Sequence, residues 1–408
     1  MSHQNKFRKF INDIHLWMGL GAGIVLFAVC LSGTILTFRS EIEYLFNPKK
    51  YDISEVSNAQ KLDIETLISK VQKQEKAKVV SITIPENSEK NYPFDLMKKE
   101  GRTSERKEKT EKPKKTGKPE KSGKSGKAEK KKHQRPTAYY INPYSGEIAG
   151  KDGGGTSTFF MTMMKLHRWL LLEDSIGRPI VGIATIIFVL LSFSGLILWF
   201  PRKFRHWKRW FYWKPGFKIK FGARWKRINH DLHNTLGFYS LIFVLIMSLT
   251  GLCWSFEWYK NGMSSLMKSE VFAGRNEKPV EIEISGNQTI PLSRILDTVN
   301  QELPYQGDVR ISLPKDSATA MTVSKTKKGF FALSAPDKLF VNPYSGEIVK
   351  KNLFKDFPLN VQIVSLIRAL HTGEVFGTFS KILYFLACLI GTSLPVTGTL
   401  IWLNKMKK

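Results

Sequence analysis

Residues 16–38 read LWMGLGAGIVLFAVCLSGTILTF, and this run without a charged side chain decides the class of the protein. An α-helix rises about 1.5 Å per residue, so about 20 apolar residues cross a hydrocarbon layer of about 30 Å. Three further stretches have the same character, at 178–200, 235–256 and 379–403. The sequence therefore predicts an α-helical membrane protein with four transmembrane helices.

The first span follows the basic segment NKFRKF and could be mistaken for a secretory signal. It is long, however, and the sequence after it (TFRSEIEYLF) offers no small-residue cleavage site, so we interpret it as an uncleaved span. The three cysteines, Cys30, Cys253 and Cys388, all fall within spans. Their placement fits neither a disulfide framework nor a metal-binding motif.

Basic residues in the short loops predict the orientation. Residues 201–230 contain eleven Lys or Arg and no acidic residue, which is typical of a cytoplasmic loop. Both termini are basic as well, so four crossings would leave both in the cytoplasm. The expected segments are 1–14 (cytoplasmic), 15–38 (first span), 39–165 (outside domain), 166–200 (outer ligand segment and second span), 201–232 (cytoplasmic loop), 233–256 (third span), 257–368 (outside domain), 369–403 (outer ligand segment and fourth span) and 404–408 (cytoplasmic).

One stretch of the first outside domain is also basic. Residues 98–135 hold seventeen Lys or Arg against six Glu, but long translocated loops largely escape the positive-inside rule. This tract has too few apolar residues to fold, which predicts a disordered insertion. It and loop 201–230 each carry a net charge of +11 of the total of +28. The charge is therefore local, and without a recognisable nucleic-acid module it does not predict a nucleic-acid partner.

The heptapeptide NPYSGEI occurs twice, at 142–148 and at 342–348. Each copy follows a stretch with apolar residues at helical spacing (61–74 and 291–303) and then several β-rich stretches, so a helix followed by three or four strands is expected in both halves. Asn-Pro-x-Ser-Gly favours a hairpin turn. We interpret this pattern as an internal duplication, with a small α+β domain outside the membrane in each half.

Four of the eight histidines lie near the end of a span, and each span has a glycine near its far end. The spacings are eighteen residues in spans one and three, and twenty-eight and twenty-seven in spans two and four. Spans one and three are therefore equivalent, as are two and four. The four pairs of residues are His15 with Gly33, His233 with Gly251, His167 with Gly195, and His371 with Gly398.

With the predicted orientation, His15 and His233 lie at the cytoplasmic face, whereas His167 and His371 lie at the outer face. Two histidines at each face, one from each half, are what a six-coordinate haem iron requires. A single histidine at a span end is more commonly an interfacial polar residue, but intramembrane ionisable residues are functional candidates. His230 competes with His233, and we prefer His233 because its spacing to a glycine repeats that of His15.

Neighbouring residues leave several alternatives open. Arg168 and Arg368 could meet haem propionates or anchor helices at the interface. The glycines could let helices approach closely or admit a porphyrin face. Methionines in FFMTMMKLHRWLL (159–171) could bind copper, although flexible packing is the commoner role.

Missing motifs narrow the chemistry. The sequence has no Cys-x-x-Cys-His, so the two haems would be non-covalent and b-type. It has neither Gly-x-Gly-x-x-Gly nor Gly-Lys-Ser/Thr, so no nucleotide or dinucleotide site is expected. The electrons would then come from a separate donor.

YYINPYSGEI and LFVNPYSGEI resemble the hairpin of the PepSY domain. The whole chain resembles the PepSY-associated transmembrane family, the iron-regulated inner-membrane proteins that include ferric-siderophore reductases. The segments that carry the resemblance are HLWMGLGAG (15–23), LHRWLL (166–171), SGLILWFPRK (194–203), HDLHNTLG (230–237) and LHTGEVFG (370–377).

The resemblance implies a di-haem reductase in the bacterial inner membrane, carrying electrons to a ferric siderophore or other iron chelate outside. A cytoplasmic flavoprotein or quinol would be the donor. The basic loop 201–230 would attract an acidic flavoprotein or bind anionic membrane lipids. Two alternatives remain at this point: a membrane-anchored binding or inhibitory protein without redox activity, and an electron conduit for another periplasmic reductase.

Overall fold

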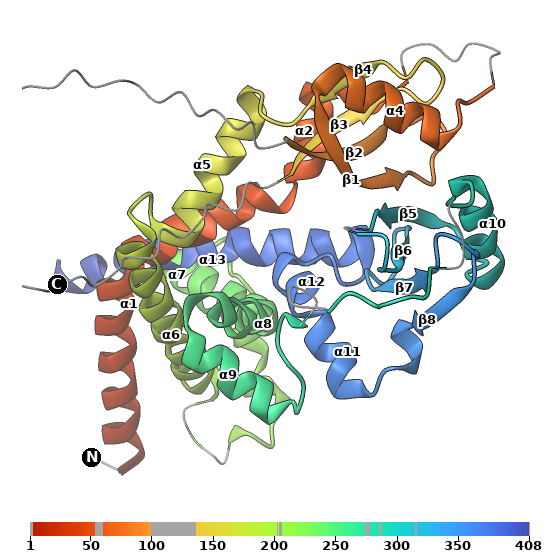
Figure 1. Cartoon of the computed structure of the whole chain (residues 1–408). Helices are drawn as coiled ribbons and strands as arrows, with labels where there is room; N and C mark the ends of the chain where they lie inside the picture. The colour runs from red at the N-terminus through yellow and green to blue at the C-terminus, as the bar shows by residue number, and fades with distance from the viewer. Residues whose placement is uncertain are drawn as a thin grey trace, which may run out of the picture.

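The computed structural model of the chain describes residues 3–53, 60–98, 136–201, 203, 206–273, 278–284, 288–314 and 316–407. It contains a bundle of long helices and a sheet with helices of its own (Figure 1). The predicted insertion 98–135 lies, apart from Lys98, outside the described residues.

Within the described ranges, four helical segments are long and apolar enough to cross a membrane. They are α1 (His3–Thr37), α6 (Asp174–Trp199), α13 (Gly377–Met406), and the continuous run of α7 (Trp225–Asp231), one π-helical turn (Leu232–Leu236) and α8 (Gly237–Ser255). The four predicted spans are thus present as helices. The first and third begin earlier than the apolar stretches, because the polar residues before them continue the helix.

The four long helices form a bundle in which α1 and α8 each pack against both α6 and α13. Ala22 and Leu26 of α1 form a buried cluster with Ala184 and Leu191 of α6. Large apolar side chains such as Ile24 of α1, by contrast, are exposed on the outside of the bundle. An apolar exterior is what a bundle needs in order to contact lipid.

Eight strands form one antiparallel sheet in the order β4-β3-β2-β1-β5-β6-β7-β8. Helix α4 (Ile64–Glu75) precedes the first four strands, and helix α10 (Leu292–Glu302) precedes the last four. A helix followed by four strands therefore occurs in both halves, as the sequence predicts. The strands are β1 (Ala77–Ile84), β2 (Tyr92–Lys98), β3 (Thr137–Ile141), β4 (Ile148–Lys151), β5 (Gly307–Ser312), β6 (Met321–Lys327), β7 (Pro336–Val341) and β8 (Ile348–Asn352).

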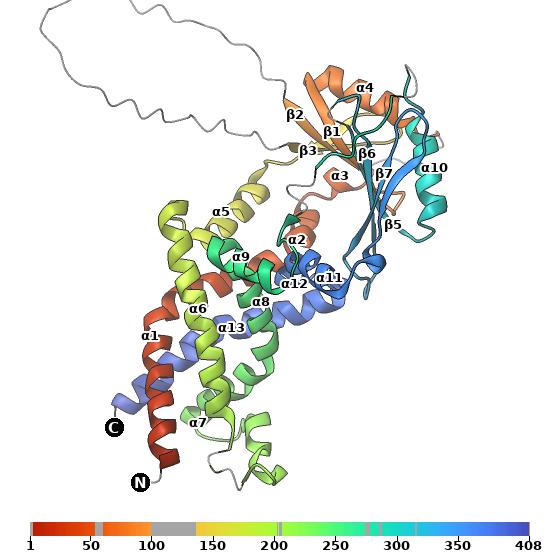
Figure 2. The same cartoon turned by 60° about the horizontal axis from the view of Figure 1, so that its bottom comes forward.

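The two helix-and-strand units are joined through their first strands. β1 pairs with β5 from Ser81↔Ser312 to Ile84↔Val309. One apolar core runs through both units, and it includes Leu67 of α4 and Ile295 of α10, both fully buried. Helices α4 and α10 lie at the end of the molecule far from the two chain termini (Figure 2).

The repeated heptapeptide forms the β3–β4 and β7–β8 turns, as predicted. The side-chain oxygen of Asn142 accepts the N–H of Tyr144 at 2.9 Å, and Asn342 does the same for Tyr344. Gly146 and Gly346 have φ of 76° and 78°, the left-handed region that favours glycine. Both heptapeptides are therefore structural turns.

Shorter helices connect the spans to the strands (Figure 1). They are α2 (Arg39–Phe46), α3 (Pro48–Tyr51), α5 (Gly155–Trp169), α9 (Glu257–Leu266), α11 (Leu359–Ser365) and α12 (Ile367–Thr372). The chain turns sharply after α5, where Leu170 has φ of 54°, and after α12, where Gly373 has φ of 80°. Helices α5 and α12 therefore end just before α6 and α13 begin.

Candidate functional site

Four histidines come together in two pairs inside the helical part of the molecule. The ring centroids of His15 and His233 are 6.2 Å apart with planes at 90°, and those of His167 and His371 are 6.1 Å apart with planes at 59°. We call His15 and His233 the terminus-side pair, and His167 and His371 the sheet-side pair. Each pair takes one histidine from each half of the chain, which is the grouping that the sequence spacing indicates.

The helices place these side chains in two ways. In the terminus-side pair, His15 lies on α1 and His233 lies in the π-helical turn before α8. π-Helical turns are rare in proteins, and those that occur are often found at functional sites. In the sheet-side pair, His167 and His371 lie in the last turns of α5 and α12.

A glycine lies against each imidazole. A Cβ built on any of the four glycines would stand only 3.0–3.4 Å from the Cε1 atom of the histidine beside it. The pairs in contact are Gly195 with His15, Gly398 with His233, Gly33 with His167, and Gly251 with His371. From the sequence, two roles were possible for these glycines: close packing of helices, or contact with a porphyrin face. In the structure they give the rings room to lie against a neighbouring helix.

Serine and threonine hydroxyls bind the terminus-side pair. Nδ1 of His15 is 2.9 Å from Oγ of Ser194, and Nδ1 of His233 is 2.9 Å from Oγ1 of Thr397. Each hydroxyl also donates to a carbonyl of its own helix, at 3.1 Å for Ser194 and 3.0 Å for Thr397. A hydroxyl has a single hydrogen, so an oxygen that donates to the carbonyl can accept the Nδ1–H of its histidine.

Backbone carbonyls bind the sheet-side pair. Nδ1 of His167 is 2.9 Å from the carbonyl oxygen of Val29, and Nδ1 of His371 is 2.9 Å from that of Met247. A carbonyl only accepts, so Nδ1 carries the hydrogen in these rings too. The hydroxyls of Ser32 and Thr250 lie farther from these nitrogens, at 3.4 and 3.2 Å.

All four hydroxyl residues directly precede the four glycines. They are Ser32, Ser194, Thr250 and Thr397, and they were not predicted as site residues from the sequence. The signal that could have found them is the repetition of Ser-Gly or Thr-Gly near the far end of every span.

These hydrogen bonds fix the chemistry of the rings. A neutral imidazole with hydrogen on Nδ1 has its lone pair on Nε2, the nitrogen that can bind a metal. No residue in the described part of the chain hydrogen-bonds Nε2 of any of the four. Metal–imidazole bonds of about 2 Å put the centroids of two opposed rings about 6 Å apart. Both pairs therefore have the spacing of two ligands on opposite sides of one metal ion.

The other predicted residues lie differently. His230 is more than half exposed, with Nδ1 3.7 Å from a carboxylate oxygen of Asp231. The guanidinium of Arg168 lies 4.7 Å from the ring centre of Trp169, and Arg368 is exposed on α12. The structure thus pairs His15 with His233 and leaves His230 at the surface.

Two nitrogen donors are the whole set that each pair offers. In the ranges that the structure describes, no three His, Cys, Asp or Glu side chains lie together in a way that could hold a metal ion. Cys30, Cys253 and Cys388 are free thiols.

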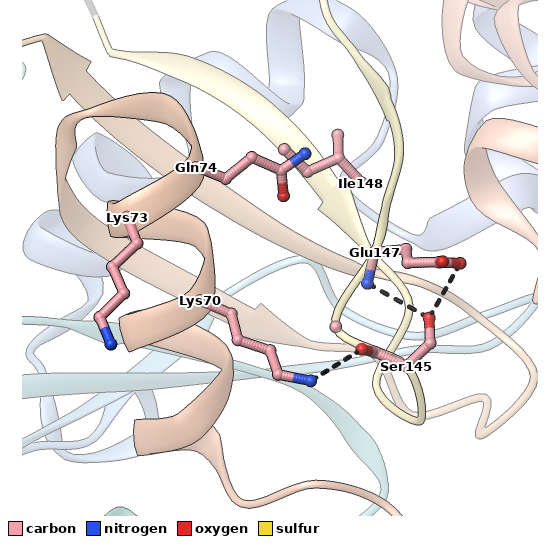
Figure 3. A pocket seen from close by; sticks show the side chains of 7 residues that line it. Lys70, Lys73, Gln74, Ser145, Glu147 and Ile148 are labelled. Atoms are coloured by element: carbon pink, nitrogen blue, oxygen red, sulfur yellow. Dashed lines mark hydrogen bonds between the residues drawn. The ribbon is translucent and has the colours of Figure 1, made fainter.

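A separate open hollow of about 630 Å³ lies in the sheet part, between α4 and the β3–β4 turn (Figure 3). Lys70 donates to the carbonyl of Ser145 there, and Lys73 extends beside it without joining that contact. The residues that line the hollow come from α4 and the β3–β4 turn, and none of the four histidines is among them. It therefore belongs to neither pair.

Comparison with known proteins agrees with this architecture. The family model described as PepSY-associated TM region matches residues 13–405, which is nearly the whole chain. No curated protein matches the chain.

Proposed function

The chain belongs to the PepSY-associated TM region family and is a helical membrane protein, and from this premise we propose that it is a di-haem b-type reductase of ferric chelates. The observation that carries the proposal is the geometry of the two histidine pairs, with ring centroids 6.2 and 6.1 Å apart and every Nδ1 hydrogen-bonded. That geometry leaves four Nε2 atoms as ligands for two metal centres.

The residues around the pairs fit a haem. His15 and His233 would hold one haem, and His167 and His371 would hold the other. When bound, haem supplies four further nitrogen ligands and an iron that changes between Fe(III) and Fe(II). Beside the sheet-side pair, Nε1 of Trp169 is a buried donor without a hydrogen-bond partner among the described residues. This N–H and the guanidinium of Arg168 would receive the propionates.

The two pairs lie at opposite ends of the first span. His15 belongs to the terminus-side pair and Gly33 touches the sheet-side pair, so eighteen residues of α1 separate the two levels. At helical rise this is about 27 Å. Two sites at these levels would divide the membrane crossing into shorter electron-transfer steps.

The proposed orientation in the membrane follows from the charges of the loops. The basic loop 201–230 and both basic termini would place the terminus-side pair at the cytoplasmic face of a bacterial inner membrane. The sheet-side pair and the two sheet units, which we interpret as PepSY-like products of an internal duplication, would then face the periplasm.

The proposed reaction transfers one electron to each Fe(III). A quinol donor would release two electrons one after the other, together with two protons, and would reduce two ferric ions; a cytoplasmic flavoprotein would deliver the same electrons from its flavin. Hard oxygen donors hold Fe(II) less tightly than Fe(III), so reduction would release iron from a siderophore.

The first test is the visible spectrum of the purified protein. We expect a dithionite-reduced b-type band. His15→Ala and His371→Ala should each remove about half of it, because each removes a histidine that would hold one of the two haems. His230→Ala is the matched control and should leave the band intact. A colourless wild-type protein would overturn the proposal and would favour a membrane-anchored binding or inhibitory protein.

The second test concerns the acceptor. Dithionite-reduced protein, freed of excess reductant, should be reoxidised by ferric siderophores faster than by iron-free acceptors. Reoxidation by the iron-free acceptors alone would instead support an electron conduit for another reductase.

A further inference from the structure

The four histidines bond to two different kinds of oxygen. At the terminus-side pair the nearest acceptors of Nδ1 are the hydroxyls of Ser194 and Thr397, each at 2.9 Å. At the sheet-side pair they are the carbonyls of Val29 and Met247, also at 2.9 Å. The two pairs are otherwise alike in centroid distance and in glycine contact.

The difference in the nearest acceptor of Nδ1 arises within an arrangement that all four histidines share. Each hydroxyl residue stands three positions after a carbonyl that also points toward the same histidine, and either oxygen can be the closer one. Val29 precedes Ser32 in this way, and its carbonyl is closer to His167 by 0.5 Å (2.9 against 3.4 Å). At His15 and His233 the hydroxyl is the partner at 2.9 Å, and the carbonyls of Leu191 and Leu394 also interact with these two rings.

We propose that Ser194 and Thr397 are positioning residues that set the ligand strength of the terminus-side histidines, whereas Ser32 and Thr250 have no such role at the sheet-side pair. This inference rests on the proposed haem sites. A hydrogen bond from Nδ1–H makes Nε2 a stronger electron donor and fixes the ring orientation, and a stronger donor favours Fe(III) over Fe(II).

Removing the hydroxyl should therefore act at one pair only. In Ser194→Ala or Thr397→Val, Nδ1–H loses its 2.9 Å acceptor, Nε2 donates less strongly, and the equilibrium at that site shifts toward Fe(II). In Ser32→Ala or Thr250→Val the carbonyl bond remains. Loss of a residue that hydrogen-bonds a metal-bound histidine typically changes metal affinity or activity by a factor of about 10 or more.

The experiment is a spectroelectrochemical titration of the purified wild-type protein and the four variants, with EPR of the ferric state. Imidazole planes at 90° in one pair and 59° in the other would give distinct low-spin signals, so each site can be followed separately. We expect a shift of about 10-fold toward Fe(II), about 59 mV for one electron, at the terminus-side site in Ser194→Ala and Thr397→Val. Ser32→Ala and Thr250→Val are the matched controls.

A structural effect is separated by rescue. Ser194→Thr and Thr397→Ser keep a hydroxyl and should restore the wild-type midpoint potential. Equal shifts in all four hydroxyl-removing variants, or no shift in Ser194→Ala and Thr397→Val with haem content intact, would overturn the inference while leaving the proposed function in place. A wild-type protein without haem would instead overturn the proposed function.

Discussion

Gly251 leaves less room beside its histidine than the other three glycines. A Cβ at this position would lie 3.0 Å from Cε1 of His371, closer than side-chain carbons normally approach. Gly251→Ala should therefore push the imidazole out of line and reduce the bound haem from about two per chain toward about one. A pyridine haemochrome assay against protein concentration measures this ratio.

Gly21→Ala is the control for the glycine prediction. Gly21 lies on α1, and a Cβ there would have no atom within 4 Å. This variant should keep its full haem content and gain slightly in helix stability. Full haem content in Gly251→Ala as well would show that the imidazole does not need the space.

The pairing of the histidines could be predicted from sequence, because the number of residues between histidine and glycine is nearly the same in both halves of the chain. The hydroxyls of Ser194 and Thr397 could not, because their role depends on how neighbouring helices rotate about their axes. A change in rotation of one helix would bring the carbonyl closer instead, as at His167. Whether His230 or His233 faces His15 likewise depends on the helical phase of the third span.

At the scale of elements, the strand pair β1–β5 joins the two sheet units, and Ile82 and Ile311 face each other across it with no exposed surface. Ile82→Ala removes buried methyl groups from the shared core. Such truncations cost about 2–5 kcal/mol. Thermal unfolding in detergent should show a clear loss of stability of the sheet part.

Lys78→Ala provides the comparison for this strand, because Lys78 is exposed on β1 four residues before Ile82. Surface changes of this kind alter stability by about 0.5 kcal/mol or less. If both variants unfold at the same temperature, the pairing of β1 with β5 does not contribute to the stability that is measured.

Helix α2 is attached to α13 by an ion pair. The Lys381 side chain, only 7% exposed, lies 2.8 Å from Glu41 and 3.6 Å from Glu374. Burial by itself raises the pKa of Glu41, but the hydrogen bonds and the charge of Lys381 lower this pKa overall. A carboxyl with a lowered folded-state pKa stabilises the protein above its unfolded pKa of about 4.3, and this contribution disappears as the pH falls through the folded value.

The melting temperature should therefore fall more steeply in the wild-type protein than in Glu41→Gln as the pH drops below about 4.3. Glu41 is half exposed, so the difference corresponds to about 1 kcal/mol or less. Glu89→Gln, which removes an exposed glutamate charge, should follow the wild-type curve. Parallel curves for all three proteins would argue against a stabilising role of the pair.

The elements themselves could be predicted in kind, with errors at the junctions between them. Apolar runs predicted the four spans, and the heptapeptide predicted both hairpins. The sequence did not show that β1 would pair with β5, because the first strand of each unit carries no mark of a partner in the other unit beyond its own alternation. It also did not show the turns at Leu170 and Gly373, which place His167 and His371 on short helices before their spans.

At the scale of the whole molecule, the loop charges make a prediction about orientation. Lys208→Cys lies in the basic loop and Lys78→Cys in the sheet, and both positions are exposed. In right-side-out vesicles an impermeant maleimide should label Lys78→Cys directly, and Lys208→Cys only after the membrane is opened. The wild-type chain, whose three thiols lie in the helical part, is the background control. The reverse pattern of labelling would invert the orientation.

The seam between β1 and β5 also imposes an order on biosynthesis. Ser81 pairs with Ser312, so β1 emerges from the ribosome about 230 residues before its partner. At about 5–20 residues per second this gap lasts roughly 10–50 s, and the two middle spans are inserted within it. Throughout that interval the nascent first unit presents an unpaired strand edge, a template on which chains aggregate. That edge is covered only when β5 of the second unit pairs with it.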